Sequence, residues 1–359
     1  WGEQAMLIQA WHYAAPNYPY TCYDVLYRTP RQHVGGCLWH SFDHQRGYHP
    51  DPFYGGLMDV FRQPKYSYYM FQAQRSPKKQ DRLFETGPMV YIAHEMTPFS
   101  PKDVTVYSNC DEVRLTYNKG GKSLTYTKPV SREGMPSPII TFKDVYNFMI
   151  DKNMSMKEGR QKEVFLLAEG LINGKVVATH KVCPARRPSK LLLWIDNENT
   201  ELKADGSDFV TVIAAIADKN GNIKRLNNYY VKFHIEGEGR ILGGANVLAN
   251  PAPVKWGTAP ILVQSTLKPG KIKITASVLF EGSQMPVSAE LELESKPSAY
   301  PLIYASEEAA LIPMKSDSQS FPITAKSQKE LEKEKAVKEQ NERKLKEVEQ
   351  QQADFGEKK

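Results

Sequence analysis

The chain has 359 residues, 41% hydrophobic and 25% charged, a composition typical of globular proteins, and its length suggests roughly two or three domains. Its net charge of +6 is spread along the sequence, which argues against nucleic-acid binding, and no run of about 18 apolar residues could form a membrane-spanning helix. The four cysteines lack C-x-x-C spacing and clustered histidines, so neither structural zinc nor a disulfide framework is expected.

Residues 1–77 are rich in aromatic side chains and are predicted to hold a strand followed by a helix. Asp24–Arg31 indicates a short helix that ends near a proline. Val34–Phe42 indicates a buried strand, with Cys37 as a small apolar residue inside it. Lys65–Gln74 suits a helix, since a proline lies just before it. A strand, a long loop and a helix in this order form a βα unit.

The segment 83–185 alternates apolar and polar residues in short runs separated by turns. The runs are Val104–Tyr107, Val113–Tyr117, Val164–Ala168 and Lys175–His180. Asn173-Gly174 lies between the last two and is a strong signal for a hairpin turn. Short strands with turns at these intervals predict an immunoglobulin-like β-sandwich.

A second region of strands covers residues 189–296. Its strongest predicted strands are Phe209–Ala217, Tyr230–Ile235 and Lys271–Leu279, with a turn at Asp218–Gly221. The glycines between positions 237 and 244 are predicted to mark turns and not a nucleotide-binding loop, because neither a following helix nor a Lys-Ser/Thr pair accompanies them. The pattern predicts a second β-sandwich.

The C-terminal end changes in composition. Residues 297–325 are predicted to be an extended linker, since prolines and serines interrupt them. Residues 326–359 are dominated by Lys, Glu and Gln, and Glu334 with Lys338 and Glu339 with Arg343 form i,i+4 pairs that support a helix. Apolar positions are too sparse for a coiled coil, so we expect a charged helical or disordered tail.

Polar and aromatic side chains follow the point where the first predicted strand ends. Trp39 lies at this end, and the loop after it carries Asp43, His44 and His49. Active-site residues of a (β/α)₈ barrel lie at such strand ends. An indole face suits the C–H-rich face of a sugar, and Asp and His can bond its hydroxyls. We therefore expect sugar contacts here, with Trp11 and its two neighbours at outer subsites. The alternatives are a core role for Trp39 and ordinary exposed positions for the histidines.

The motifs of this block resemble glycoside hydrolase family 2, which includes β-galactosidases and β-glucuronidases. They are Gly35-Gly36-x-x-Trp39, Tyr54-Gly55-Gly56-Leu57-Met58-Asp59 and Arg62-x-Pro64-Lys65. The resemblance implies that Trp39 lies in the last strand of a catalytic TIM (β/α)₈ barrel and lines its sugar pocket. Val104–Asn118 and Ala204–Asp208 resemble the openings of sandwich domains in Bacteroidota members, the second of them invasin-like, so the resemblance covers about residues 1–296.

The family implies retaining hydrolysis by two carboxylates about 5–5.5 Å apart. Glu3 is the only glutamate before Trp39, and its Trp-Gly-Glu-Gln context differs from the strand-ending Glu-Tyr of the family, so Glu3 is a weaker alternative for the nucleophile. The sequence starts at Trp1 without a methionine and holds only the end of a barrel. We therefore expect the C-terminal part of a longer β-galactosidase-like enzyme, with its catalytic carboxylates upstream and no activity in this chain alone.

Two departures from the family bear on specificity. Gly55 stands where an asparagine of bacterial galactosidases helps to bind sodium, so no metal ligand is expected there. The Asn and Lys that read a glucuronide carboxylate are also absent from this loop, which favours β-galactosides. The pair His44 and His49 suits a modified galactose, or an algal or plant galactan.

A non-enzymatic function remains as a second hypothesis. The sandwiches could form a carbohydrate-binding or interaction module, with the charged helix docking a partner. The completeness of the barrel separates the two hypotheses, since a barrel needs eight strands and the first 77 residues have room for about two. The expected partner is a carbohydrate; no cofactor, nucleic acid or membrane is expected, and a homo-oligomer is left open. The family implies a periplasmic or secreted location, although this chain shows no signal peptide.

Overall fold

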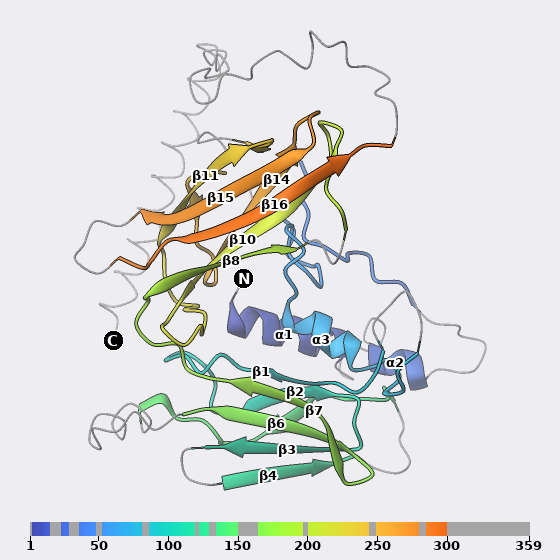
Figure 1. The fold of residues 1–359 in the computed structure, drawn as a ribbon. Helices are drawn as coiled ribbons and strands as arrows, with labels where there is room; N and C mark the ends of the chain where they lie inside the picture. Colours follow the sequence, from blue (N-terminus) through green and yellow to red (C-terminus); the bar gives the residue numbers. More distant parts are fainter. Residues whose placement is uncertain are drawn as a thin grey trace, which may run out of the picture. The chain divides into compact units, whose positions relative to one another are not determined.

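β-strands make up most of the regular structure in the computed structural model of the chain (Figure 1). The structure describes residues 2–14, 23–28, 36–47, 52–80, 86–118, 122–128, 134–149, 164–196, 200–243, 249–279 and 285–299, which belong to one structural unit. None of the helices in these ranges is long and apolar enough to cross a membrane. The predicted mostly β class is confirmed. The predicted tail 326–359 and nearly all of the linker 297–325 lie outside the described residues.

The first group of strands forms two antiparallel sheets, of order β1-β2-β5 and β4-β3-β6-β7. The strands are β1 Val90–Ala93, β2 Val104–Ser108, β3 Glu112–Tyr117, β4 Lys122–Thr127, β5 Ile140–Phe142, β6 Leu166–Ile172 and β7 Lys175–Val182. Val106 of one sheet and Leu115 and Leu166 of the other share one buried cluster, so the sheets pack face to face as a sandwich. The predicted runs Val104–Tyr107, Val113–Tyr117 and Lys175–His180 lie within β2, β3 and β7, and Val164–Ala168 overlaps the first half of β6. The immunoglobulin-like assignment stays a prediction.

The turn between β6 and β7 shows why the sequence folds locally as a hairpin. Asn173 and Gly174 have φ angles of 51° and 72°, so both central residues are left-handed, as a type I′ turn requires. Asparagine and glycine tolerate this conformation best among the amino acids. The predicted hairpin is confirmed.

Gly174→Ala is expected to lower the free energy of unfolding by about 1–2 kcal/mol. An added Cβ meets no atom within 4 Å, so the whole loss comes from holding an alanine at φ 72°. Urea denaturation followed by circular dichroism measures it. Gly174→Asn is the matched control and should cost less, because asparagine adopts this conformation more readily. Equal stability of the alanine variant and the parent chain would contradict the backbone argument.

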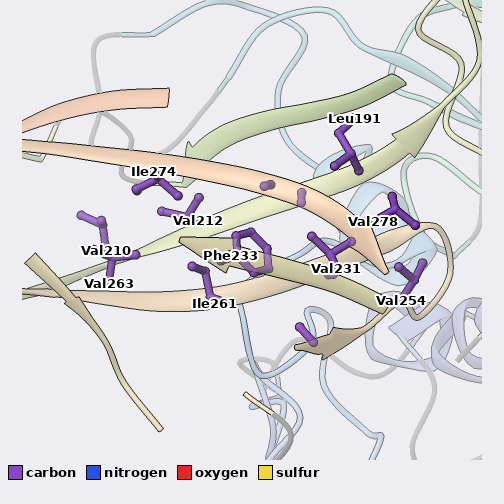
Figure 2. Packing of buried hydrophobic residues seen from close by; sticks show 14 of the residues in the cluster. Leu191, Val210, Val212, Val231, Phe233, Val254, Ile261, Val263, Ile274 and Val278 are labelled. Carbon is purple, nitrogen blue, oxygen red and sulfur yellow. The ribbon is translucent and has the colours of Figure 1, made fainter. Parts of the chain in front are cut away.

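The second group of strands also forms two sheets, of order β12-β14-β10-β8 and β13-β11-β15-β16-β9. The strands are β8 Lys190–Asp196, β9 Lys203–Ala204, β10 Phe209–Ala217, β11 Tyr230–Gly237, β12 Gly239–Ile241, β13 Ala252–Pro253, β14 Thr258–Ser265, β15 Gly270–Leu279 and β16 Ala289–Pro297. Figure 2 shows the aliphatic side chains that gather around Phe233, drawn from strands of both sheets. The three strands predicted here are confirmed as β10, β11 and β15.

Within the described residues, three short helices precede the strands: α1 Glu3–Ala14, α2 Tyr23–Arg28 and α3 Tyr66–Gln72. Met6 and Ala10 of α1 share a buried cluster with Met70 of α3 and Tyr107 of β2. The helices predicted within Asp24–Arg31 and Lys65–Gln74 are confirmed as α2 and α3, whereas α1 was not predicted. Since residues four apart lie on one face of a helix, Met6, Ala10 and Ala14 form the buried stripe of α1.

The strand predicted at Val34–Phe42 is wrong for its described part. Residues 36–41 are irregular and mostly exposed, and the segment makes one isolated bridge, Phe42 with Met58. Cys37, predicted to be buried, is exposed. A central barrel strand needs a neighbour along each edge. Among the described residues this segment pairs only with the chain around Met58, so its apolar residues have no sheet to enter.

Candidate functional site

The candidate site lies on an irregular hairpin formed by residues 36–47 and 52–65. His44 and Phe53 exchange two backbone hydrogen bonds, of 3.3 and 2.9 Å, and the Asp43 N–H donates to the Met58 carbonyl at 2.9 Å. Gly56 permits this approach, because a Cβ there would lie 2.3 Å from the Asp43 nitrogen. The hairpin therefore holds residues 40–46 against residues 53–58.

A buried ion pair forms the base of the hairpin. Lys65 Nζ donates to Asp43 Oδ1 at 2.6 Å, and only 4% of the lysine and 2% of the aspartate side chain is exposed. Lys65 also donates to the Tyr54 carbonyl, and the Gly56 N–H donates to Asp43 Oδ1. Asp43 Oδ2 is buried and has no hydrogen-bond partner among the described residues. The pair joins the two arms of the hairpin to the start of α3.

Basic and aromatic side chains gather on the outer part of the hairpin. The rings of His40 and His44 lie 4.6 Å apart, and those of His40 and Phe53 also lie 4.6 Å apart. The Arg46 guanidinium stacks over the Phe53 ring at 4.5 Å. We call His40, His44, Arg46 and Phe53 the basic cluster. The Trp39 ring lies 5.9 Å from His40, and 88% of Trp39 is exposed.

The pKa of His40 is lowered from its ordinary value. Desolvation is the largest cause, and the charges of His44 and Arg46 add to it. Each of these two neighbours repels a second positive charge on the His40 imidazole. The basic cluster thus places two imidazoles and a guanidinium around one phenyl ring, beside an exposed indole.

Helix α1 holds the second arm of the hairpin in place. Gln9 Nε2 donates to the carbonyls of Tyr54 and Gly56, both at 3.0 Å, and the Tyr13 hydroxyl donates to the Gly55 carbonyl at 2.5 Å. A shallow pocket opens along this contact, and its lining includes His12 and Tyr13 of α1 with Tyr54 and Gly55 of the hairpin.

The predicted sugar-contacting residues fall in different surroundings. Trp39 is exposed and His44 is half-buried, whereas Asp43 is buried and engaged by Lys65. Trp11, 45% exposed, is absent from the pocket lining that its neighbours His12 and Tyr13 share. His49 lies outside the described residues. The sugar-binding roles of these five residues remain predictions.

Sequence reasoning missed two members of the basic cluster. Arg46 and Phe53 were not singled out, although they lie close to the residues that were. Alternating His and aromatic residues between two glycine pairs would have been the available signal. No group of three or more His, Cys, Asp and Glu in the described ranges is placed to hold a metal ion.

Glu3, the weaker alternative for the nucleophile, lies at the start of α1 and is 4% exposed. Its carboxylate accepts hydrogen bonds from the Glu95 N–H at 2.8 Å and the Ser100 hydroxyl at 2.6 Å. Burial raises its pKa to about 7, although both hydrogen bonds and Arg225 oppose that rise. Glu3 therefore contacts the loop after β1, and no contact with the hairpin is seen in the described structure.

Glu95 extends this contact to other parts of the fold. Its carboxylate accepts a hydrogen bond from the Tyr66 hydroxyl of α3 at 3.1 Å and pairs with Arg225, which precedes β11, at 3.0 Å. The Arg225 guanidinium also donates to the Trp256 carbonyl. Glu95 thus forms hydrogen bonds with residues of α1, of α3 and of the segment before β11.

Comparison with known proteins decides the family. A model described as glycoside hydrolase family 2 C-terminal domain 5 matches residues 193–279. A β-galactosidase from Thermoanaerobacter pseudethanolicus is 32% identical over 273 residues, which are 74% of this chain and 34% of that protein. The chain belongs to glycoside hydrolase family 2. It carries the C-terminal portion of the family, as the motifs predicted.

A further relative and a solved structure from family 2 also resemble this chain. A β-galactosidase from Bacteroides ovatus is 28% identical over 68% of the chain and 27% of its own length. The solved structure of a family 2 β-glucuronidase matches 83% of the chain with a TM-score of 0.58 at 22% identity, and 28% of that structure is covered. At this identity the likeness shows the fold alone. The chain spans about a third or less of the curated relatives, with 34% and 27% covered.

Proposed function

We propose that this chain is part of a retaining glycoside hydrolase that removes terminal β-galactosides from oligo- or polysaccharides. The observation that carries the proposal is the exposed Trp39 on a hairpin that bears the family motifs, next to imidazole groups that can bond hydroxyls. The two relatives named β-galactosidase support the choice of galactoside. The substrate would be a β-galactoside, with an algal or plant galactan as the extended form.

The catalytic carboxylates belong, in this proposal, to barrel strands outside this chain. Glu3 supports this view, since its carboxylate is committed to Ser100 and to the Glu95 N–H. A retaining mechanism needs a second carboxylate about 5–5.5 Å away that also faces the sugar. The chain would supply one wall of the pocket and the two sandwiches behind it. Its periplasmic or secreted location rests on the family resemblance alone.

Hydrolysis of nitrophenyl glycosides tests the proposal. This chain alone should not release nitrophenol, whereas the protein extended upstream of Trp1 through its own reading frame should hydrolyse the β-galactoside faster than the β-glucuronide. Trp39→Ala in the extended protein should lower kcat/KM by about tenfold, the loss of one stacking surface. Turnover by this chain alone that is abolished by Glu3→Gln would contradict the proposal. So would an extended protein that prefers the glucuronide.

A further inference from the structure

We infer that the ion pair of Asp43 and Lys65 is a positioning pair, which sets the register of the hairpin and thereby holds Trp39 where a sugar can stack on it. Both residues act through Trp39, and an indirect role of this kind replaces the direct sugar contact expected of Asp43. The inference rests on the proposed function and deepens it, because it adds two residues on which turnover of the glycoside depends.

The ion pair lies where the two arms of the hairpin meet the start of α3. The Lys65 N–H donates to the Leu57 carbonyl at 2.9 Å, and the Leu57 N–H donates to the Ser41 carbonyl at 3.0 Å. The Lys65 side chain crosses the same arms, since its Nζ reaches the Tyr54 carbonyl at 3.0 Å and Asp43 Oδ1 at 2.6 Å. Lys65 therefore binds the second arm with its backbone and the first arm with its ammonium group.

The backbone of the hairpin specifies its own register only weakly. The bridges of Phe42 with Met58 and of His44 with Phe53 are isolated and belong to no regular strand, and two adjacent glycines lie in the second arm. Strands that are short, irregular or rich in glycine are prone to slip, and a slip of one residue turns each side chain to the opposite face. A buried ion pair opposes such a slip, because a shifted register would leave both charges buried and unpaired.

The position of Trp39 depends on this register. Its side chain is 88% exposed, so packing does little to fix the indole, and residues 36–38 before it are exposed as well. The arm is anchored two residues later, where the Ser41 carbonyl accepts hydrogen bonds from the Leu57 and Met58 N–H groups at 3.0 and 3.1 Å. A change of register at this anchor would turn the indole away from its present face of the hairpin.

A positioning role can be separated from a role in stability. Replacing a buried ion pair by apolar residues of similar size is often neutral for the free energy of unfolding. Here Asp43 Oδ2 is buried without a hydrogen-bond partner among the described residues, so part of the cost of burying the carboxylate is not offset. The double variant Asp43→Leu with Lys65→Met should therefore be about as stable as the parent chain, although it lacks the pair that sets the register.

Steady-state kinetics of the extended protein with nitrophenyl β-galactoside test the inference. The double variant should lower kcat/KM by about tenfold, with the same division between kcat and KM as Trp39→Ala. In the Trp39→Ala background it should cause no further loss, because the pair acts through that indole. Lys143→Met with Asp103→Leu, which removes an exposed pair of similar length, should leave kcat/KM unchanged. Additive losses would overturn the inference, since Asp43 or Lys65 would then act independently of Trp39.

Nuclear magnetic resonance of the 359-residue chain gives a measurement that does not need activity. The chain has five tryptophans, and Trp39→Phe identifies the indole N–H signal of Trp39 by its loss. We expect the double variant to displace or split this signal, whereas an unchanged signal would overturn the inference. If the double variant fails to fold, Asp43→Asn, which keeps the size of the side chain and removes its charge, takes its place in both measurements. An extended protein without galactosidase activity would contradict the proposed function, and the Trp39 signal would still decide the inference.

Discussion

Replacing Lys65 by methionine should lower the free energy of unfolding by about 3–5 kcal/mol. The substitution keeps most of the apolar stem of the side chain but removes the cation that faces Asp43. The aspartate would then be a buried charge, 2% exposed, with the Gly56 N–H as its remaining described donor. Urea denaturation of the parent chain and the variant measures the difference.

Two further variants show whether burial of the ion pair causes the loss of stability in Lys65→Met. Lys143 pairs with Asp103 at 2.7 Å, close to the 2.6 Å of the buried pair, but 76% of Lys143 is exposed. Lys143→Met should therefore cost about 0–1 kcal/mol. The double variant Asp43→Leu with Lys65→Met should recover stability relative to Lys65→Met, since no buried charge is left. Similar losses for the buried and the exposed lysine would refute the argument.

Glu3 should make the stability of the chain fall as the pH rises from about 4.5 to about 7. Its pKa is raised by burial from 4.5 to about 7 in the folded chain. Between these values the folded state keeps a proton that the unfolded state has released, so the free energy of unfolding decreases with pH. The contribution of Glu3 to this change is about 3 kcal/mol, and it becomes constant above pH 7.

Glu3→Gln should remove this slope, because glutamine is neutral at every pH. The variant should be more stable than the parent chain at pH 8 and close to it at pH 4. Urea denaturation at a series of pH values measures both curves. Glu294→Gln is the control: Lys296 lowers the pKa of Glu294, so this variant should change the pH dependence of stability only below about pH 4.5 and leave the slope between pH 5 and 7 intact. Burial lowers the pKa of His94 to about 4, which adds an opposite slope to both curves, so the difference between the two curves is what reports on Glu3. A difference that stays constant between pH 5 and 7 would show that Glu3 is ionised throughout.

The sandwich strands were predictable because local signals agree there. In β10, β11 and β15 the β-branched residues and the flanking turns indicate the same element, and each strand formed where expected. Helix α1 was missed because aromatic residues around it obscured the spacing of Met6, Ala10 and Ala14. These three are the residues that the fold buries, so the helical period was present in the sequence.

The candidate site was less predictable, since its contacts join residues distant in sequence. Asp43 and Lys65 are 22 positions apart, and nothing in either local pattern indicates that they meet. Asp43 was expected to face a sugar because of its place after Trp39, yet the turn at Gly56 directs it toward Lys65. The strand expected at Val34–Phe42 depended on neighbours that the described residues do not supply. The family motifs identified the family, but not the internal contacts of this segment.

The contacts of Glu95 affect how the chain unfolds. Its N–H binds Glu3 of α1, and its carboxylate binds Tyr66 of α3 and Arg225 of the second sandwich. Removing any one of these segments leaves a partly buried polar group without a partner, which destabilises the segments that stay. These contacts link α1, α3, the loop after β1 and the segment before β11, so the loss of one of them is expected to lower the stability of the others.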